Sequence, residues 1–182
     1  MSKHASIQSV IIYGVFIIYI LFLLKLLLLS RISFGELFYG ERSLSREINL
    51  VPFRGIIEYI FGNEAVIRKF AFSNVIGNIV IFIPLGVYLS LFLNDKRIMP
   101  ALWLVFLVSF LVEAVQGVFG LGTADVDDII LNCLGGWMGI LGYKLLVFVL
   151  REEKKVRTAV TIISALGLPI LLFLLFMVRL RL

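Results

Sequence analysis

Five apolar runs of about 20 residues constrain this chain more than any other feature. A helix needs about 20 apolar residues to cross the ~30 Å hydrocarbon core of a bilayer, so each run is long enough to span one. The alternating strands of a membrane barrel give a different and weaker pattern. We therefore predict an all-α, polytopic membrane helical bundle, a single membrane domain over 1–182 with about five transmembrane helices. The predicted spans cover residues 10–29, 73–93, 99–119, 126–149 and 158–178.

Composition agrees with a membrane protein. Hydrophobic residues make up 61% of the chain, against roughly 45–50% in soluble domains, and the mean hydropathy is +1.07. The net charge is +5, but the basic residues flank the apolar runs, where they set orientation and contact anionic lipid. We therefore expect membrane lipid as a partner, and no nucleic acid.

The reactive side chains are few. His4 is the single histidine and Cys133 the single cysteine. These counts exclude a disulfide within the chain, a His- or Cys-based zinc site and a Ser-His-Asp triad, because each needs partners that the chain lacks. We expect neither zinc nor haem.

The one long loop precedes the second span. Its segment NLVPFRGI runs over 49–56, and Pro52 together with Asn49 predicts a turn there. The short apolar stretch over 56–61 cannot span, so we predict that it is interfacial or re-entrant. Lys25, inside the first span, has two interpretations: its ammonium reaches the interface, or it is a counter-ion for buried acids.

Polar side chains also occur within or beside three of the spans. Acids inside a bilayer are costly when unpaired, and such residues usually face a protein interior or a water-filled cleft and mark function. The positive-inside rule, applied to the short loops, puts the N-terminus in the cytoplasm and all of these side chains at the outer face of the membrane. The candidate ligand-binding residues are Asn49, Asn78, Glu113, Gln116, Asp125, Asp127, Asp128 and Asn132.

The acidic run that begins at Asp125 has several interpretations. Asp125 is a natural N-cap, and carboxylates in a first helical turn are stabilised by the helix dipole. Alternatively, Glu113, Asp125 and Asp128 could hold a divalent cation (Mg²⁺, Ca²⁺ or Mn²⁺), since these ions favour carboxylate oxygens. Glu113 and Asp128 could instead act as catalytic acid and base, or bind a cationic group. For Glu113, hydrogen bonding within the bundle to Asn78 or Asn132 is the structural alternative. The spacing does not select among them.

Four motifs resemble the VanZ-like family of bacterial membrane proteins, named for an accessory protein of teicoplanin resistance. They are NLVPF at 49–53, N-x3-F-x-P-x-G at 78–86, E-x2-Q at 113–116 and D-x-D-D-x3-N-x2-G at 125–135, so the VanZ-like region covers about 49–143. The resemblance implies a multi-pass envelope protein and, for some members, reduced susceptibility to glycopeptides. Similar proteins often carry a basic residue shortly before the aspartates, whereas this loop reads GLGTA at 120–124.

Three hypotheses for function follow. The first is a non-enzymatic protein that binds or shields a lipid, a lipid-linked cell-wall precursor or a glycopeptide at an acidic outer-face cleft and so contributes to teicoplanin resistance. The second is a membrane enzyme that uses the Glu113 and Asp128 carboxylates or a divalent metal on a lipid-linked substrate. The third is a small transporter or flippase, which in so short a chain would have to form a homo-oligomer.

Overall fold

The computed structural model confirms an all-α protein, and among the residues that it describes five helices are long and apolar enough to cross a membrane. The structure describes residues 3–29, 48–49, 51–53, 57, 61, 65–93, 97–120 and 123–177. The helices are α1 (Lys3–Leu24), continued by the π-helix η1 (Lys25–Leu29), then α4 (Ala65–Leu93), α5 (Met99–Phe119), α6 (Val126–Leu150) and α7 (Glu153–Met177).

Three of these helices begin earlier than the predicted spans. α1 begins at Lys3, α4 at Ala65 and α7 at Glu153, because a helix continues past the apolar segment that hydropathy detects. Of the apolar stretch predicted to be interfacial, only Ile57 and Phe61 lie within the described residues.

The chain divides into two compact units. One contains residues 1–43 and 145–182, and the other contains residues 44–144. The single membrane domain remains a prediction.

In the first unit, α1 and α7 run parallel. Gln8 Nε2 donates to Thr158 Oγ1 at 2.9 Å, and Lys25 Nζ donates to the Leu175 carbonyl oxygen at 2.7 Å. The separation along the chain is 150 residues in both pairs, so the two helices advance together. Spans one and five of an alternating five-span protein must run in the same direction, and this contact agrees with that order.

The Lys25 ammonium thus has a main-chain carbonyl as a partner. Leu175 lies in the last turn of α7, where carbonyl oxygens lack partners within the helix. A cation there also interacts favourably with the negative end of the helix dipole. Lys25 therefore joins the end of α7 to α1.

In the second unit, α4 and α6 run parallel and very close together. A Cβ atom built on Gly135 would lie 2.1 Å from the Ile79 carbonyl oxygen, and one on Gly139 would lie 2.0 Å from the Ile83 carbonyl oxygen. Only glycine permits this approach, because any other residue would bring its side chain into the neighbouring backbone. The glycines thereby allow the polar side chains of α4 to reach α6.

α5 runs antiparallel to α6. A Cβ on Gly136 would meet the Val105 side chain, and one turn earlier on α6 Asn132 Nδ2 donates to Ser109 Oγ at 2.9 Å. Gly120 caps the end of α5, and its left-handed φ of 62° lets its N–H bond to the Gln116 carbonyl oxygen.

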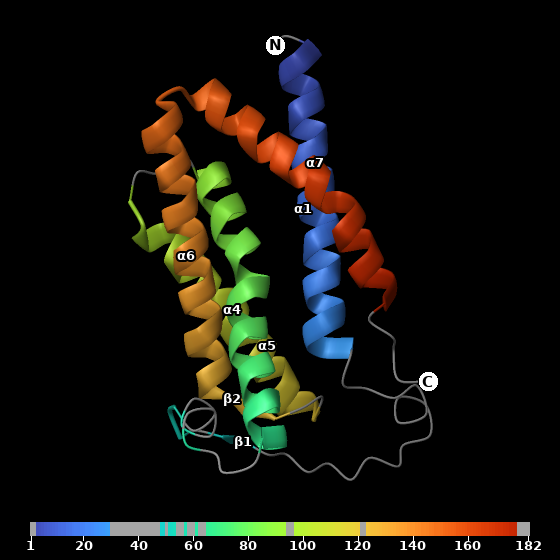
Figure 1. The fold of residues 1–182 in the computed structure, drawn as a ribbon, viewed down its shortest axis with the longest axis vertical. Helices are drawn as coiled ribbons and strands as arrows, with labels where there is room; N and C mark the ends of the chain where they lie inside the picture. Colours follow the sequence, from blue (N-terminus) through green and yellow to red (C-terminus); the bar gives the residue numbers. More distant parts are fainter. Residues whose placement is uncertain are drawn as a thin grey trace. The chain divides into compact units, whose positions relative to one another are not determined.

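A two-residue parallel bridge ties the long loop to the start of α6. β1 (Ile48–Asn49) pairs with β2 (Ala124–Asp125) in the register Ile48 to Ala124 and Asn49 to Asp125. Figure 1 shows both strands at the end of the second unit where α4 and α6 begin. The loop that carries Asn49 is thus held at the polar end of these helices.

Candidate functional site

Asp125 caps α6 and also binds the loop. Its Oδ1 accepts the N–H of Asp127 at 2.9 Å, which is the N-cap bond, and its Oδ2 accepts Asn49 Nδ2 at 3.1 Å. An N-cap of this kind stabilises a helix by about 1 kcal/mol. The capping interpretation therefore describes part of what Asp125 does, and the same carboxylate also fastens the loop.

Glu113 approaches the same point from α5. Its side chain is 6% exposed, and its Oε2 accepts the main-chain N–H of Asp125 at 2.9 Å. Glu113 lies two turns before the end of α5, so this bond holds the end of one span to the start of the next. This donor is a main-chain N–H group, and the amides of Asn78 and Asn132, which were predicted as partners, bond Asp128 and Ser109.

Asp127 holds the loop at a second point. It is 2% exposed, and its Oδ1 accepts the N–H of Phe53. Phe53 has a left-handed φ of 67°, a conformation that costs an L-residue roughly 1–2 kcal/mol. A hydrogen bond to a charged group contributes about 1.5–3 kcal/mol, so the bond to Asp127 offsets the strain.

Asp128 joins α6 to α4. Its Oδ1 accepts Asn74 Nδ2 at 3.1 Å and Asn78 Nδ2 at 2.5 Å. Both Asp128 and Asn78 are buried, and hydrogen bonds to a charged acceptor are stronger than those between neutral groups. Asp128 is therefore the polar link of a helix pair that glycines bring together.

Two further candidate residues lie on the same helices. Asn132 is 1% exposed, and its amide nitrogen bonds Ser109. Gln116 is also buried, on α5. Ser109 lies on α5 one turn before Glu113, so the bond from Asn132 joins α6 to α5 next to the Glu113 contact.

Two contacting residues were absent from the predicted site. Asn74 lies four residues before Asn78, and Ser109 lies four residues before Glu113. Residues four apart share a helical face, so the spacing in the sequence places each of the two beside a predicted site residue.

We call Glu113, Asp125, Asp127 and Asp128 the acidic cluster. Hydrogen bonds link its members to α4, to α5 and to the loop at Asn49 and Phe53. Among the described residues, no three His, Cys, Asp or Glu side chains are grouped so that they could hold a metal ion. A divalent cation therefore remains a prediction from the sequence, whereas the hydrogen bonds described above join the cluster to main-chain N–H groups and Asn amides.

Known proteins resemble this chain over the region that holds the cluster. The VanZ/LLP1 family profile matches residues 16–149. "Protein VanZ" of Enterococcus faecium is 33% identical over 107 residues, which are 59% of this chain. The alignment covers 56% of that relative, so the chain matches little more than half of its length. No solved structure matches the chain. The family profile covers all four residues of the acidic cluster and most of the chain, and the protein therefore belongs to the VanZ family.

Proposed function

We propose that this protein binds a lipid or cell-wall-related ligand at the acidic cluster, on the outer face of the bacterial cytoplasmic membrane, and thereby contributes to glycopeptide (teicoplanin) resistance. The observation that supports binding is the burial of Glu113, Asp127 and Asp128 at the end of membrane helices. Acids in such positions are rare and usually mark a functional site.

The chemistry of the cluster favours a cationic or hydrogen-bond-donating group as the part of the ligand that it contacts. Carboxylates only accept hydrogen bonds when ionised. Four of them, supplied by α5, β2 and the first turn of α6, attract positive charge more strongly in a low-dielectric surrounding than in water. Amino groups on lipid headgroups or on wall precursors have this chemistry.

Removal of one charge with little change in shape tests the proposal. Asp128→Asn keeps an oxygen that can accept from Asn74 and Asn78 but carries no charge. We expect a teicoplanin-susceptible host that expresses this variant to be as susceptible as the host without the protein. The control is Glu152→Gln, the same change at an acid whose side chain is 60% exposed outside the cluster, and it should retain the resistance of the unmodified protein.

Equal amounts of each variant in the membrane fraction, checked by immunoblot, make the comparison valid. Full resistance with Asp128→Asn at equal expression would show that the charge of the cluster is not needed. Mass spectrometry of envelope lipids and wall precursors from the same strains separates binding from catalysis. The burial of Glu113 and Asp128 in one cluster is also compatible with an enzyme. If the protein is an enzyme, the spectra should show a lipid or wall precursor that is new or missing when the protein is expressed.

A further inference from the structure

Three large apolar side chains in the loop that follows β1 are exposed. Phe53, Ile57 and Phe61 have exposed fractions of 52%, 53% and 73%. The Ile57 N–H donates to the Phe53 carbonyl oxygen at 2.8 Å, and Ile57 and Phe61 are both helical. Ile57 and Phe61 are four residues apart, so their side chains lie on one face of a helix, and Phe53 is hydrogen-bonded to the first of them. We call Phe53, Ile57 and Phe61 the apolar stripe.

Phe53, the first residue of the stripe, is hydrogen-bonded to the start of α6. The N–H of Phe53 donates to the carboxylate of Asp127, which lies in the first turn of α6. Just before it, the N–H of Val51 donates to Asn49 Oδ1 at 3.3 Å, and Asn49 belongs to the bridge with β2. The apolar stripe therefore begins at the level of the first turn of α6.

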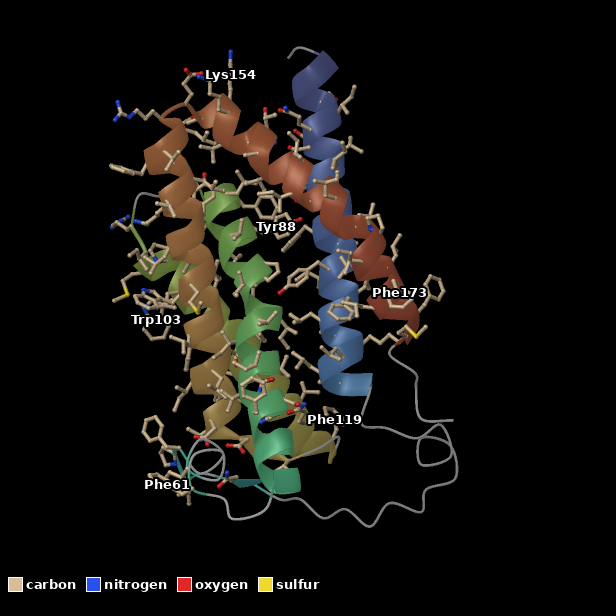
Figure 2. The ribbon with its side chains drawn as sticks, viewed as in Figure 1. Phe61, Tyr88, Trp103, Phe119, Lys154 and Phe173 are labelled. Carbon is tan, nitrogen blue, oxygen red and sulfur yellow. The ribbon has the colours of Figure 1, made fainter. Side chains whose placement is uncertain are left out.

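The length of α6 indicates where this level would lie in a membrane. α6 has 25 residues, which at 1.5 Å per residue give a length of about 38 Å, whereas the hydrocarbon core is about 30 Å thick. When such a helix is centred in the core, its first turn lies where acyl chains meet headgroups. Phe119, at the end of α5, is also exposed, and Figure 2 shows Phe61 and Phe119 toward the same end of the long axis, away from Trp103.

We propose that the apolar stripe lies in the membrane interface, with the side chains of Phe53, Ile57 and Phe61 inserted between the lipid headgroups. Short helical segments with one apolar face lie in the plane of the interface in this way. The partner is the bilayer itself, in the leaflet next to the acidic cluster. Contact with lipid would hold the loop from one side, while Asp125 and Asp127 hold it from the other.

The proposal is tested by placing a tryptophan in the stripe and measuring its depth in the bilayer. The chain has two tryptophans, so Trp103→Phe with Trp137→Phe gives a tryptophan-free protein into which Phe61→Trp introduces one probe. The protein is reconstituted in phosphatidylethanolamine and phosphatidylglycerol vesicles whose acyl chains are brominated near the carboxyl end or near the methyl end. We expect blue-shifted emission that is quenched more by bromine near the carboxyl end.

The reference for depth is Trp137, kept alone by Trp103→Phe. It lies about 17 Å along α6 from Val126, near the middle of the membrane, and should be quenched more by bromine near the methyl end. Ile57→Trp in the tryptophan-free protein provides a second probe of the stripe if the variant at position 61 does not fold, as judged by its elution in gel filtration.

Two results would overturn the proposal. Quenching by aqueous acrylamide, with no quenching by either brominated lipid, would place the stripe in water. Blue-shifted emission without lipid quenching would mean that protein, such as a second copy of this chain, covers the stripe. The measurement needs no ligand, so its outcome is independent of the proposed function.

Discussion

The glycine contact between α4 and α6 allows a sharp test of the fold. Gly139→Ala adds one methyl group, whose carbon would lie 2.0 Å from the Ile83 carbonyl oxygen. Gly142→Ala adds the same group three residues further along the same helix, where a Cβ atom has nothing within 4 Å. The two variants differ in what the methyl group meets.

The expected magnitude follows from that difference. Ordinary contacts begin near 3.4 Å, so α4 and α6 must move apart locally by about 1.4 Å. Added volume in a well-packed interior costs typically 1–3 kcal/mol, and alanine returns up to about 1 kcal/mol through its higher helix propensity. We expect Gly139→Ala to lower the free energy of unfolding by about 1–2 kcal/mol and Gly142→Ala to leave it unchanged or raise it by up to about 1 kcal/mol.

Unfolding by SDS in mixed micelles, followed by circular dichroism, measures both variants against the unmodified protein. Because only Gly139 lies against the backbone of α4, the decisive result is which of the two variants has the lower free energy of unfolding. If Gly139→Ala were as stable as Gly142→Ala, the helices would not be in contact at this glycine.

Two further variants test single hydrogen bonds. Asp125→Ala removes the N-cap of α6 and should lower the free energy of unfolding by about 1 kcal/mol in the same SDS titration. Asp125→Asn should keep most of the stability. An alanine variant as stable as the unmodified protein would contradict the capping role. Lys25→Met removes the cation at the end of α7 and should cost about 0.3–1 kcal/mol. Lys25→Arg should keep the bond to the Leu175 carbonyl, and equal melting temperatures for the Met and Arg variants would show that the bond contributes nothing.

The number of spans could be predicted from the sequence because lipid imposes one simple condition, about 20 apolar residues for each crossing. The starts of three helices, α1, α4 and α7, could not. In α4 the helix includes Arg68 and Lys69, whose charges end the apolar run but not the backbone hydrogen bonding. The bridge between β1 and β2 was also missed, because two residues of strand leave no alternating pattern in the sequence.

The candidate site shows the same limits. Helical spacing places Asn74 with Asn78 and Ser109 with Glu113 on shared faces. It does not show how each helix is turned about its axis, and this rotation decides that Asn132 bonds Ser109. The donors to Glu113 and Asp127 are main-chain N–H groups, which every residue except proline possesses, and so no residue type marks them in the sequence.

The bridge between Asn49 and Asp125 also sets an order of events during synthesis. Asn49 leaves the ribosome 76 residues before its partner, and at roughly 5–20 residues per second the interval is about 4–15 s. During this interval α4 and α5 are made, while β2, with which the loop pairs at the start of α6, has not yet been synthesised. The acidic cluster can therefore be completed only after three consecutive spans, α4, α5 and α6, have entered the membrane. A protein in which the cluster has formed has inserted all three.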